Sequence, residues 1–191
     1  FSEWLADVKD VRAPEALAVG LPTKRVESWK YVSTRGLART TWQPASPQTT
    51  EQFALTGGQF TNVPTVDGFS VSENTLTASE QKRLDRMSQA HGFSLTQAVL
   101  ENTRLALTIQ PTASVVLNLH HLANQASSAG FATLVLSVEA GGQLTLVEQF
   151  ESTDIESANL SSLRCLVTLS RDSSVTHVRF QAANATAHVF S

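Results

Sequence analysis

The stretch VEAGGQLTLVE, residues 138–148, is matched 31 residues later by LSRDSSVTHVR, residues 169–179. The same offset places Leu134 against Cys165. A fixed period of this size is typical of a solenoid, in which each turn of chain buries its apolar side chains on those of its neighbours. The repeat therefore predicts a β-solenoid built coil by coil, and a β-sandwich with similar strand spacing is the structural alternative.

The region around this repeat, residues 111–191, consists of short runs rich in β-branched and apolar residues, which indicate strands. Turn signals separate several of them, at Gly141-Gly142 and at residues 171–174. The expected strands are VVLNLHHL (115–122), FATLVLSV (131–138), QLTLVEQF (143–150), LRCLVTL (163–169), SVTHVRF (174–180) and ATAHVFS (185–191). We expect this region to be a second domain, distinct from the part that precedes it.

Residues 1–110 form the other expected domain, a mixed and partly helical one. SEWLADV predicts a helix capped by Ser2, and PEALAVG predicts a helix that starts at Pro14 and stops at Gly20. Short strands broken by Pro64 and Gly68 are expected further on. The first domain is therefore of the α+β class.

Two further helices are expected at the end of this domain. TASEQKRLDRMSQAHG contains a capping box from Thr77 to Glu80 and has Gly92 as its terminator. FSLTQAVLENTRL contains a second possible box, from Ser94 to Gln97. Each box predicts where a helix begins.

Composition limits the classes of partner. The 191 residues carry 14 Lys and Arg against 17 Asp and Glu, a formal charge of -3. Such a balance supplies no overall field for nucleic acid or an anionic membrane. No run approaches the roughly 18 apolar residues of a membrane span, and the first residues, FSEWLADVKD, lack the features of a signal peptide. We expect a cytoplasmic protein that binds neither nucleic acid nor membrane.

The residues that usually carry chemistry are sparse. Cys165 is the one cysteine, which rules out intrachain disulfides and clustered cysteine metal sites, and its place in a strand favours a buried thiol. His120 and His121 are adjacent on a strand, so they point to opposite faces and are expected to be ordinary surface or hydrogen-bonded histidines. Glu148 and Glu151 would form a hydrolytic pair only if the fold made them converge. We predict no catalytic, cofactor-binding or metal-binding residue.

The densest motif is GLPTKRVESWKY, residues 20–31. It resembles the amino-terminal signature of the SufD subunit of the Suf iron–sulfur cluster assembly system, in which GLPT precedes basic residues, an acidic residue and WKY. The stretch LSVEAGGQLTLVEQF, residues 136–150, is similar to the family's entry into its β-helix. The residues that carry the motif are Gly20, Leu21, Pro22, Thr23, Lys24, Arg25, Glu27, Trp29, Lys30 and Tyr31.

The resemblance implies a fold and a role. It implies that residues 111–191 are the first coils of a right-handed parallel β-helix, and that the chain is a fragment whose carboxy-terminal part is missing. It implies a non-catalytic scaffold of the SufBCD complex that pairs with a SufB-like β-helix subunit and, through the missing part, with a SufC-like ATPase. The fragment itself should hold no cofactor, since a cluster would be bound only transiently by the whole complex. We also expect an open final coil to favour self-association.

Two questions stay open at this level. The motif is either a structural clamp, with Pro22 fixing a corner, Trp29 and Tyr31 packing inward and Glu27 pairing with Lys24 or Arg25, or a docking surface for an assembly factor. The functional alternative is a β-helix enzyme acting on polysaccharide. Such an enzyme would carry carboxylates or basic residues clustered on an exposed sheet face, whereas the expected strands carry Thr, Ser, Asn and scattered single charges.

Overall fold

The protein combines helices with two sheets made mainly of parallel strands, and it has more strand than helix. The computed structural model describes residues 1–26, 34–48, 50–73, 76–89, 92–123, 125–151, 158–182 and 187–190. The helices are α1 (Ser2–Asp7), α2 (Ala13–Val19), α3 (Arg35–Arg39), α4 (Ala78–Ser88) and α5 (Gly92–Val99). The strands are β1 (Gln43–Pro44), β2 (Ala54–Thr56), β3 (Gln59–Thr61), β4 (Phe69–Glu73), β5 (Thr103–Ile109), β6 (Ser114–Leu122), β7 (Ser128–Val138), β8 (Gln143–Glu151), β9 (Asn159–Leu169), β10 (Ser174–Ala182) and β11 (Ala187–Phe190).

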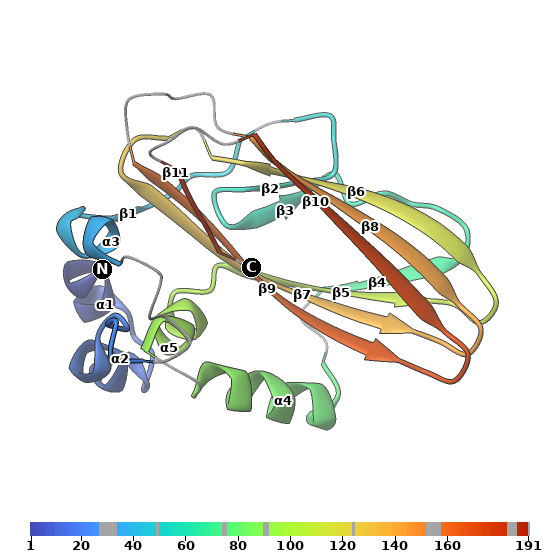
Figure 1. The fold of residues 1–191 in the computed structure, drawn as a ribbon, viewed down its shortest axis with the longest axis horizontal. Coiled ribbons are helices and arrows are strands. Elements are labelled where there is room, and N and C mark those ends of the chain that lie inside the picture. The colour runs from blue at the N-terminus through green and yellow to red at the C-terminus, as the bar shows by residue number, and fades with distance from the viewer. Residues whose placement is uncertain are drawn as a thin grey trace.

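From β5 onward, successive strands alternate between the two sheets. The first sheet has the order β11-β9-β7-β5-β4, with β1 also paired to β7, and the second has the order β10-β8-β6-β2-β3. From β5 to β11 each strand is parallel to the strand two places along the chain. In this part the chain therefore crosses from sheet to sheet at every turn, and the two sheets face each other (Figure 1).

The register of these strands matches the repeat in the sequence. Leu134 pairs with Cys165 in the first sheet, and Glu148 pairs with Arg179 in the second, both at the predicted offset of 31. The preceding turn is two residues shorter, since Leu105 pairs with Leu134. The predicted strands and the predicted register are thus confirmed.

The corners at one end of the sheets are also stacked. Thr112, Gly141 and Asp172 occupy equivalent places and have positive φ angles of 59°, 70° and 57°. The amide of Thr112 donates to Ala140 and the amide of Gly141 donates to Arg171, at 3.1 and 3.0 Å. Glycine and aspartate tolerate this left-handed conformation, which explains the turn residues at Gly141 and Asp172.

Apolar side chains fill the space between the sheets. The inward positions of the strands alternate with outward ones, and they bury residues such as Leu107, Leu117, Leu134 and Leu146 in one cluster. Cys165 packs against the same cluster, as expected for a small apolar side chain.

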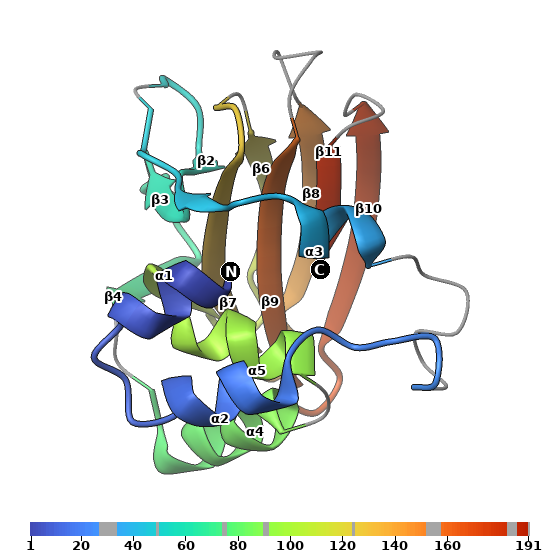
Figure 2. The same cartoon turned by 90° about the vertical axis from the view of Figure 1, so that its left-hand side faces the viewer.

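The helices lie on the outer face of the first sheet (Figures 1 and 2). Phe131 and Leu160 of that face pack into a cluster with Trp42 and with side chains of α1, α2, α3 and α5. Further along, Val135 and Leu166 pack on Leu84 of α4. One face of the stack is consequently covered by helices.

Several helix boundaries agree with their signals. Pro14 lies at the start of α2 and Gly20 caps its end with φ 65°. At α4, Thr77 and Glu80 form the predicted reciprocal capping box. Local hydrogen bonding at these ends is strong enough to decide where the helices begin and stop.

Three boundary predictions are wrong. Phe1 precedes α1 in place of Ser2, and its ring stacks on Trp42 with centroids 5.4 Å apart. Helix α4 ends at Ser88 rather than Gly92, and Gly92 instead begins α5. Ser94 therefore lies within the first turn of α5, next to Phe93, which is buried against Phe131.

The division at residue 110 stays a prediction. Strands before it pair with strands after it, since β2 pairs with β6 and β5 with β7. The stack of strands thus includes segments from the first part of the chain.

Candidate pairing edge and its polar cluster

The described part of the motif forms an anchored corner after α2. Pro22 is buried, and its carbonyl accepts a hydrogen bond of 3.0 Å from the Thr34 hydroxyl. Leu21 packs against the helical cluster, while Lys24 and Arg25 are exposed. These contacts agree with Pro22 as a structural corner. Glu27, Trp29, Lys30 and Tyr31 lie outside the described residues, so their predicted packing and pairing stay predictions.

A cleft lies next to this corner. Its volume is about 340 Å³, and Gly20, Leu21 and Thr23 of the motif line it together with Leu17 and Leu37. The lining is largely apolar side chains from α1, α2 and α3. Another molecule would fit into this cleft, so the interpretation of the motif as a docking surface stays open.

The second candidate surface is the outer edge of β10. In the described part of the chain, β8 is the strand hydrogen-bonded to β10, and β10 ends the order of the second sheet. Figure 2 shows β10 at the right-hand margin of the strands. An edge of this kind carries backbone N–H and C=O groups that a further strand can bind. Val175 is only partly buried there, whereas its equivalents Val115 and Leu144 are buried.

A polar cluster lies inside the stack directly beneath this edge. Glu148 is 1% exposed. Its Oε1 accepts a hydrogen bond of 2.9 Å from Nε2 of His121 on β6. Its Oε2 accepts from Nε2 of His177 at 2.5 Å and from Nε and Nη2 of Arg179 at 3.2 and 3.1 Å, both on β10. One buried carboxylate thus joins three neighbouring strands.

The surroundings hold these groups in definite protonation states. Burial alone raises the pKa of Glu148, but hydrogen bonds from His121 and His177 and the charge of Arg179 outweigh it and lower that pKa to about 2. Burial lowers the pKa of His121 more than Glu148 raises it. At neutral pH the cluster therefore contains an ionised carboxylate beside a neutral His121, whose ring also stacks on Phe150 with centroids 3.9 Å apart.

In the same cluster a serine, a histidine and a glutamate are linked by side-chain contacts in the order Ser161, His121, Glu148. Nδ1 of His121 lies 3.4 Å from the Ser161 hydroxyl, on the side of the ring opposite Glu148. An acyl-transfer reaction at Ser161 would need room for a substrate beside the hydroxyl. The hollow that Ser161 lines has a volume of about 10 Å³, room for about one water molecule. This arrangement is best explained as hydrogen bonding that satisfies a buried histidine.

Among the described residues, neither Cys165 nor the two carboxylates Glu148 and Glu151 is placed to form a reactive site. Burial, followed by the nearby charge of Glu148, raises the pKa of the Cys165 thiol to about 12, so the thiol stays protonated at neutral pH. Glu148 points inward and Glu151 outward, so the two do not converge. His120 points away from His121, as predicted. Among the described residues, no group of three or more His, Cys, Asp or Glu is placed to hold a metal ion.

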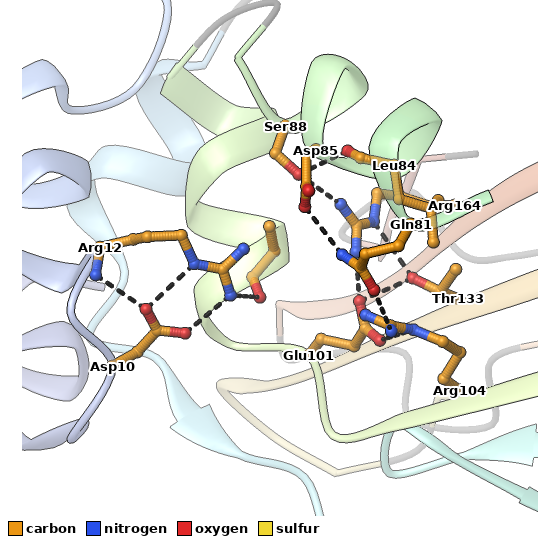
Figure 3. Close-up of polar contacts among 11 residues, drawn as sticks. Asp10, Arg12, Gln81, Leu84, Asp85, Ser88, Glu101, Arg104, Thr133 and Arg164 are labelled. Atoms are coloured by element: carbon orange, nitrogen blue, oxygen red, sulfur yellow. Dashed lines mark hydrogen bonds and ion pairs between the residues drawn. The ribbon is translucent and has the colours of Figure 1, made fainter. Parts of the chain in front are cut away.

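A second polar cluster binds the helices to the first sheet (Figure 3). Arg164 of β9 is 6% exposed and donates to Ser88 of α4 and to Thr133 of β7 at 2.9 and 3.1 Å. Its guanidinium also pairs with Glu101, which accepts from Arg104 at 2.8 Å as well. Burial lowers the pKa of Arg164, and the charge of Glu101 opposes this effect. This cluster joins α4 to two strands, and its role is best explained as structural.

Sequence reasoning missed both clusters, although a signal for each was present. The 31-residue offset aligns Glu148 with Arg179 and Thr133 with Arg164. In a stack with that period, aligned positions become lateral neighbours, so an acid aligned with a base indicates an ion pair. The same rule would have placed Arg164 beside the Thr133 hydroxyl.

Comparison with models of known protein families and with curated protein sequences finds no match to this chain. Within the described residues, none of the helices combines the length and apolarity needed to cross a membrane.

Proposed function

We propose that this protein is a SufD-like scaffold subunit of an iron–sulfur cluster assembly complex in the cytoplasm. The observation that carries the proposal is the combination of the GLPTKRVESWKY motif at residues 20–31 with parallel strands repeating at a 31-residue register. In this proposal the chain does not catalyse a reaction. It supplies a surface on which a partner subunit is held.

The proposal includes a finer description of the strands, as the first coils of a right-handed β-helix. Its support is the alternation of strands between two sheets, the parallel pairing within each sheet, and the stacked corners at Thr112, Gly141 and Asp172. Stacking of this kind is the ordinary way in which a solenoid turn buries the turn before it.

The proposed partners follow from the same resemblance. A SufB-like subunit would bind through its own β-helix, and a SufC-like ATPase would act on the assembled complex. Among the described residues β10 is paired with β8 on one side, and its other edge offers a surface for the first partner, because strand edges recruit further strands. A cluster would belong to the complex and not to this chain, whose Cys165 is partly buried and has a thiol pKa raised to about 12.

The alternative, a β-helix enzyme acting on polysaccharide, has less support. The outward positions of β6, β8 and β10 carry mainly Ser, Thr, Asn, Gln and apolar side chains, and Glu151 at the end of β8 is the carboxylate among them. Acid–base cleavage of a glycosidic bond generally needs two carboxyl groups on either side of the substrate. The face of the second sheet resembles a pairing surface more than a sugar-binding groove.

Co-expression tests the proposal. The protein is produced with a tagged SufB-like subunit and a SufC-like ATPase, and the tag is used to purify the complex. We expect this chain to be retained in fixed proportion to the SufB-like subunit. Recovery of the tagged subunits without it, under conditions in which all three are soluble, would contradict the proposed function.

A further inference from the structure

Helix α4 lies on the outer face of the first sheet and is polar for most of its length (Figure 1). Its buried residues are Leu84 and Ser88. Among the described residues, the apolar cluster around Leu84 has Val135 and Leu166 as its other buried members, with Met87 partly buried beside them. This cluster is separate from the core between the sheets and from the cluster that holds the other helices. The hydrophobic contribution that keeps α4 in place therefore comes mainly from one leucine.

The other contacts of α4 with the strands include hydrogen bonds close to the surface. Arg83 donates to the Thr168 hydroxyl at 2.8 Å and to the carbonyl of Val167 at 3.2 Å. Glu80 accepts a hydrogen bond of 3.2 Å from the Ser137 hydroxyl. The net contribution of such bonds to stability is small, because water takes the place of the lost partner when they break. These bonds fix the position of α4 on the sheet but add little to its stability.

The buried ion pair under α4 does not depend on the helix (Figure 3). Arg164 donates to Ser88 of α4 at 2.9 Å, whereas its partners Thr133 and Glu101 lie outside α4. Without α4 the guanidinium would lose the serine, which water can replace, and would keep its carboxylate. The large cost of leaving a buried charge unpaired is therefore avoided when α4 moves away.

We propose that α4 detaches from the first sheet as a unit, in a local opening that leaves both sheets and the other helices folded. Elements held by few buried apolar contacts are the ones that open below the free energy of global unfolding. The opening uncovers Val135 and Leu166, which are 1% and 4% exposed when α4 is in place. Helix α4 is in this sense a movable cover over part of the sheet. The inference goes beyond the proposed function and does not depend on it.

Native-state hydrogen exchange followed by NMR tests the inference on the full chain. The amides of residues 82–88, which are bonded within α4, should share one opening free energy. After correction for intrinsic rates, we expect them to exchange at least about a hundredfold faster than the slowest amides of β7 and β8. Low concentrations of urea should accelerate the exchange of α4 only weakly, because its opening exposes little surface.

Two core substitutions separate a local opening from global unfolding. Leu134→Val removes a methylene from the core between the sheets and destabilises the closed and the open form equally. It should speed the slowest amides of β7 and β8 about fivefold and leave those of α4 unchanged. Leu84→Ala should speed the exchange of α4 about thirtyfold or more, as expected for the loss of a buried leucine.

A matched pair of surface substitutions tests the polar contacts. Arg83→Ala removes the hydrogen bonds to Thr168 and Val167, so it should speed the exchange of α4 about threefold. Arg86→Ala is the control, since Arg86 is exposed on the same helix and has no hydrogen bond from its side chain to the described strands. It should leave the exchange of α4 within about twofold of the wild type.

Exchange of α4 at the rate and with the urea dependence of the strands would overturn the inference, and so would acceleration of α4 by Leu134→Val. Amides of α4 that open one after another from the ends, each with its own free energy, would show fraying in place of detachment and would also overturn it. The proposed function is unaffected by either result, because these measurements involve no partner subunit.

Discussion

Replacing Glu148 by glutamine should destabilise the protein strongly at neutral pH. The substitution keeps the size of the side chain but removes its negative charge. That charge interacts with His121 on β6 and with His177 and Arg179 on β10. The pKa of Glu148 is about 2 in the folded protein, against an ordinary value of 4.5. Since a tenfold change in proton affinity corresponds to about 1.4 kcal/mol, the native surroundings favour the ionised form by roughly 3 kcal/mol.

The sign of this effect determines its pH dependence. Because the folded pKa lies below the unfolded one, the unfolded chain binds the proton more readily, and acid weakens folding. The contribution of Glu148 is complete above about pH 5 and is lost as the pH falls toward 2. By pH 3 the wild type should have lost roughly 2 kcal/mol that Glu148→Gln does not lose. His121, whose pKa is also lowered, adds a loss of the same sign that begins below its ordinary value of 6.5.

Urea unfolding measured at several pH values between 7 and 3 provides the assay. We expect the unfolding free energy of Glu148→Gln to be lower than that of the wild type by about 3 kcal/mol at pH 7, and the gap to shrink toward pH 3. Glu151→Gln is the control, because this residue lies on the same strand with its half-exposed side chain outward, and it should change the free energy by less than about 0.5 kcal/mol. A variant as stable as the wild type at pH 7, or a gap independent of pH, would refute the reasoning.

Three further predictions concern other parts of the chain. Cys165 should react with a thiol reagent at pH 7 only after denaturation, because burial raises its pKa to about 12; fast labelling of the native protein would contradict this. Gly141→Ala should lower the unfolding free energy by about 1 kcal/mol or more, since the corner requires φ 70° while the added Cβ would meet its nearest neighbour, Thr112, at an ordinary 3.4 Å; an unchanged urea midpoint would contradict this. Anaerobic reconstitution with iron and sulfide should leave no stoichiometric chromophore on the isolated chain, and a stable cluster abolished by Cys165→Ser would make Cys165 a ligand.

The strand region was predictable because its information is periodic. The match between residues 138–148 and 169–179 encodes both the strands and their lateral register, since in a stack the period equals the pairing offset. Helix caps, which depend on hydrogen bonds between residues close in the sequence, could be predicted equally well, as the capping box of Thr77 and Glu80 shows. These features depend on short-range chemistry or on repetition.

What sequence reasoning missed depends on contacts between distant segments. Trp42 lies in a stretch rich in Pro, Ser and Thr, yet it is 1% exposed because Phe1 and other residues of the helical cluster close over it. The start of α5 was misplaced as well, since Ser94 lies inside the helix, next to Phe93, which is buried against the distant Phe131. The repeat aligns Arg164 with Thr133, but Glu101, which lies 63 residues from Arg164, is outside that alignment.

Hydrogen–deuterium exchange of β10 tests the central claim most directly. Exchange of the amides of residues 174–182 is measured on the protein alone and after addition of a purified SufB-like subunit. Added strands protect amides at the edge they bind, so the account predicts slower exchange along β10, with little change on the helix-covered face around α4. Unchanged exchange along β10 in a complex that demonstrably forms would contradict the claim that this edge binds the partner.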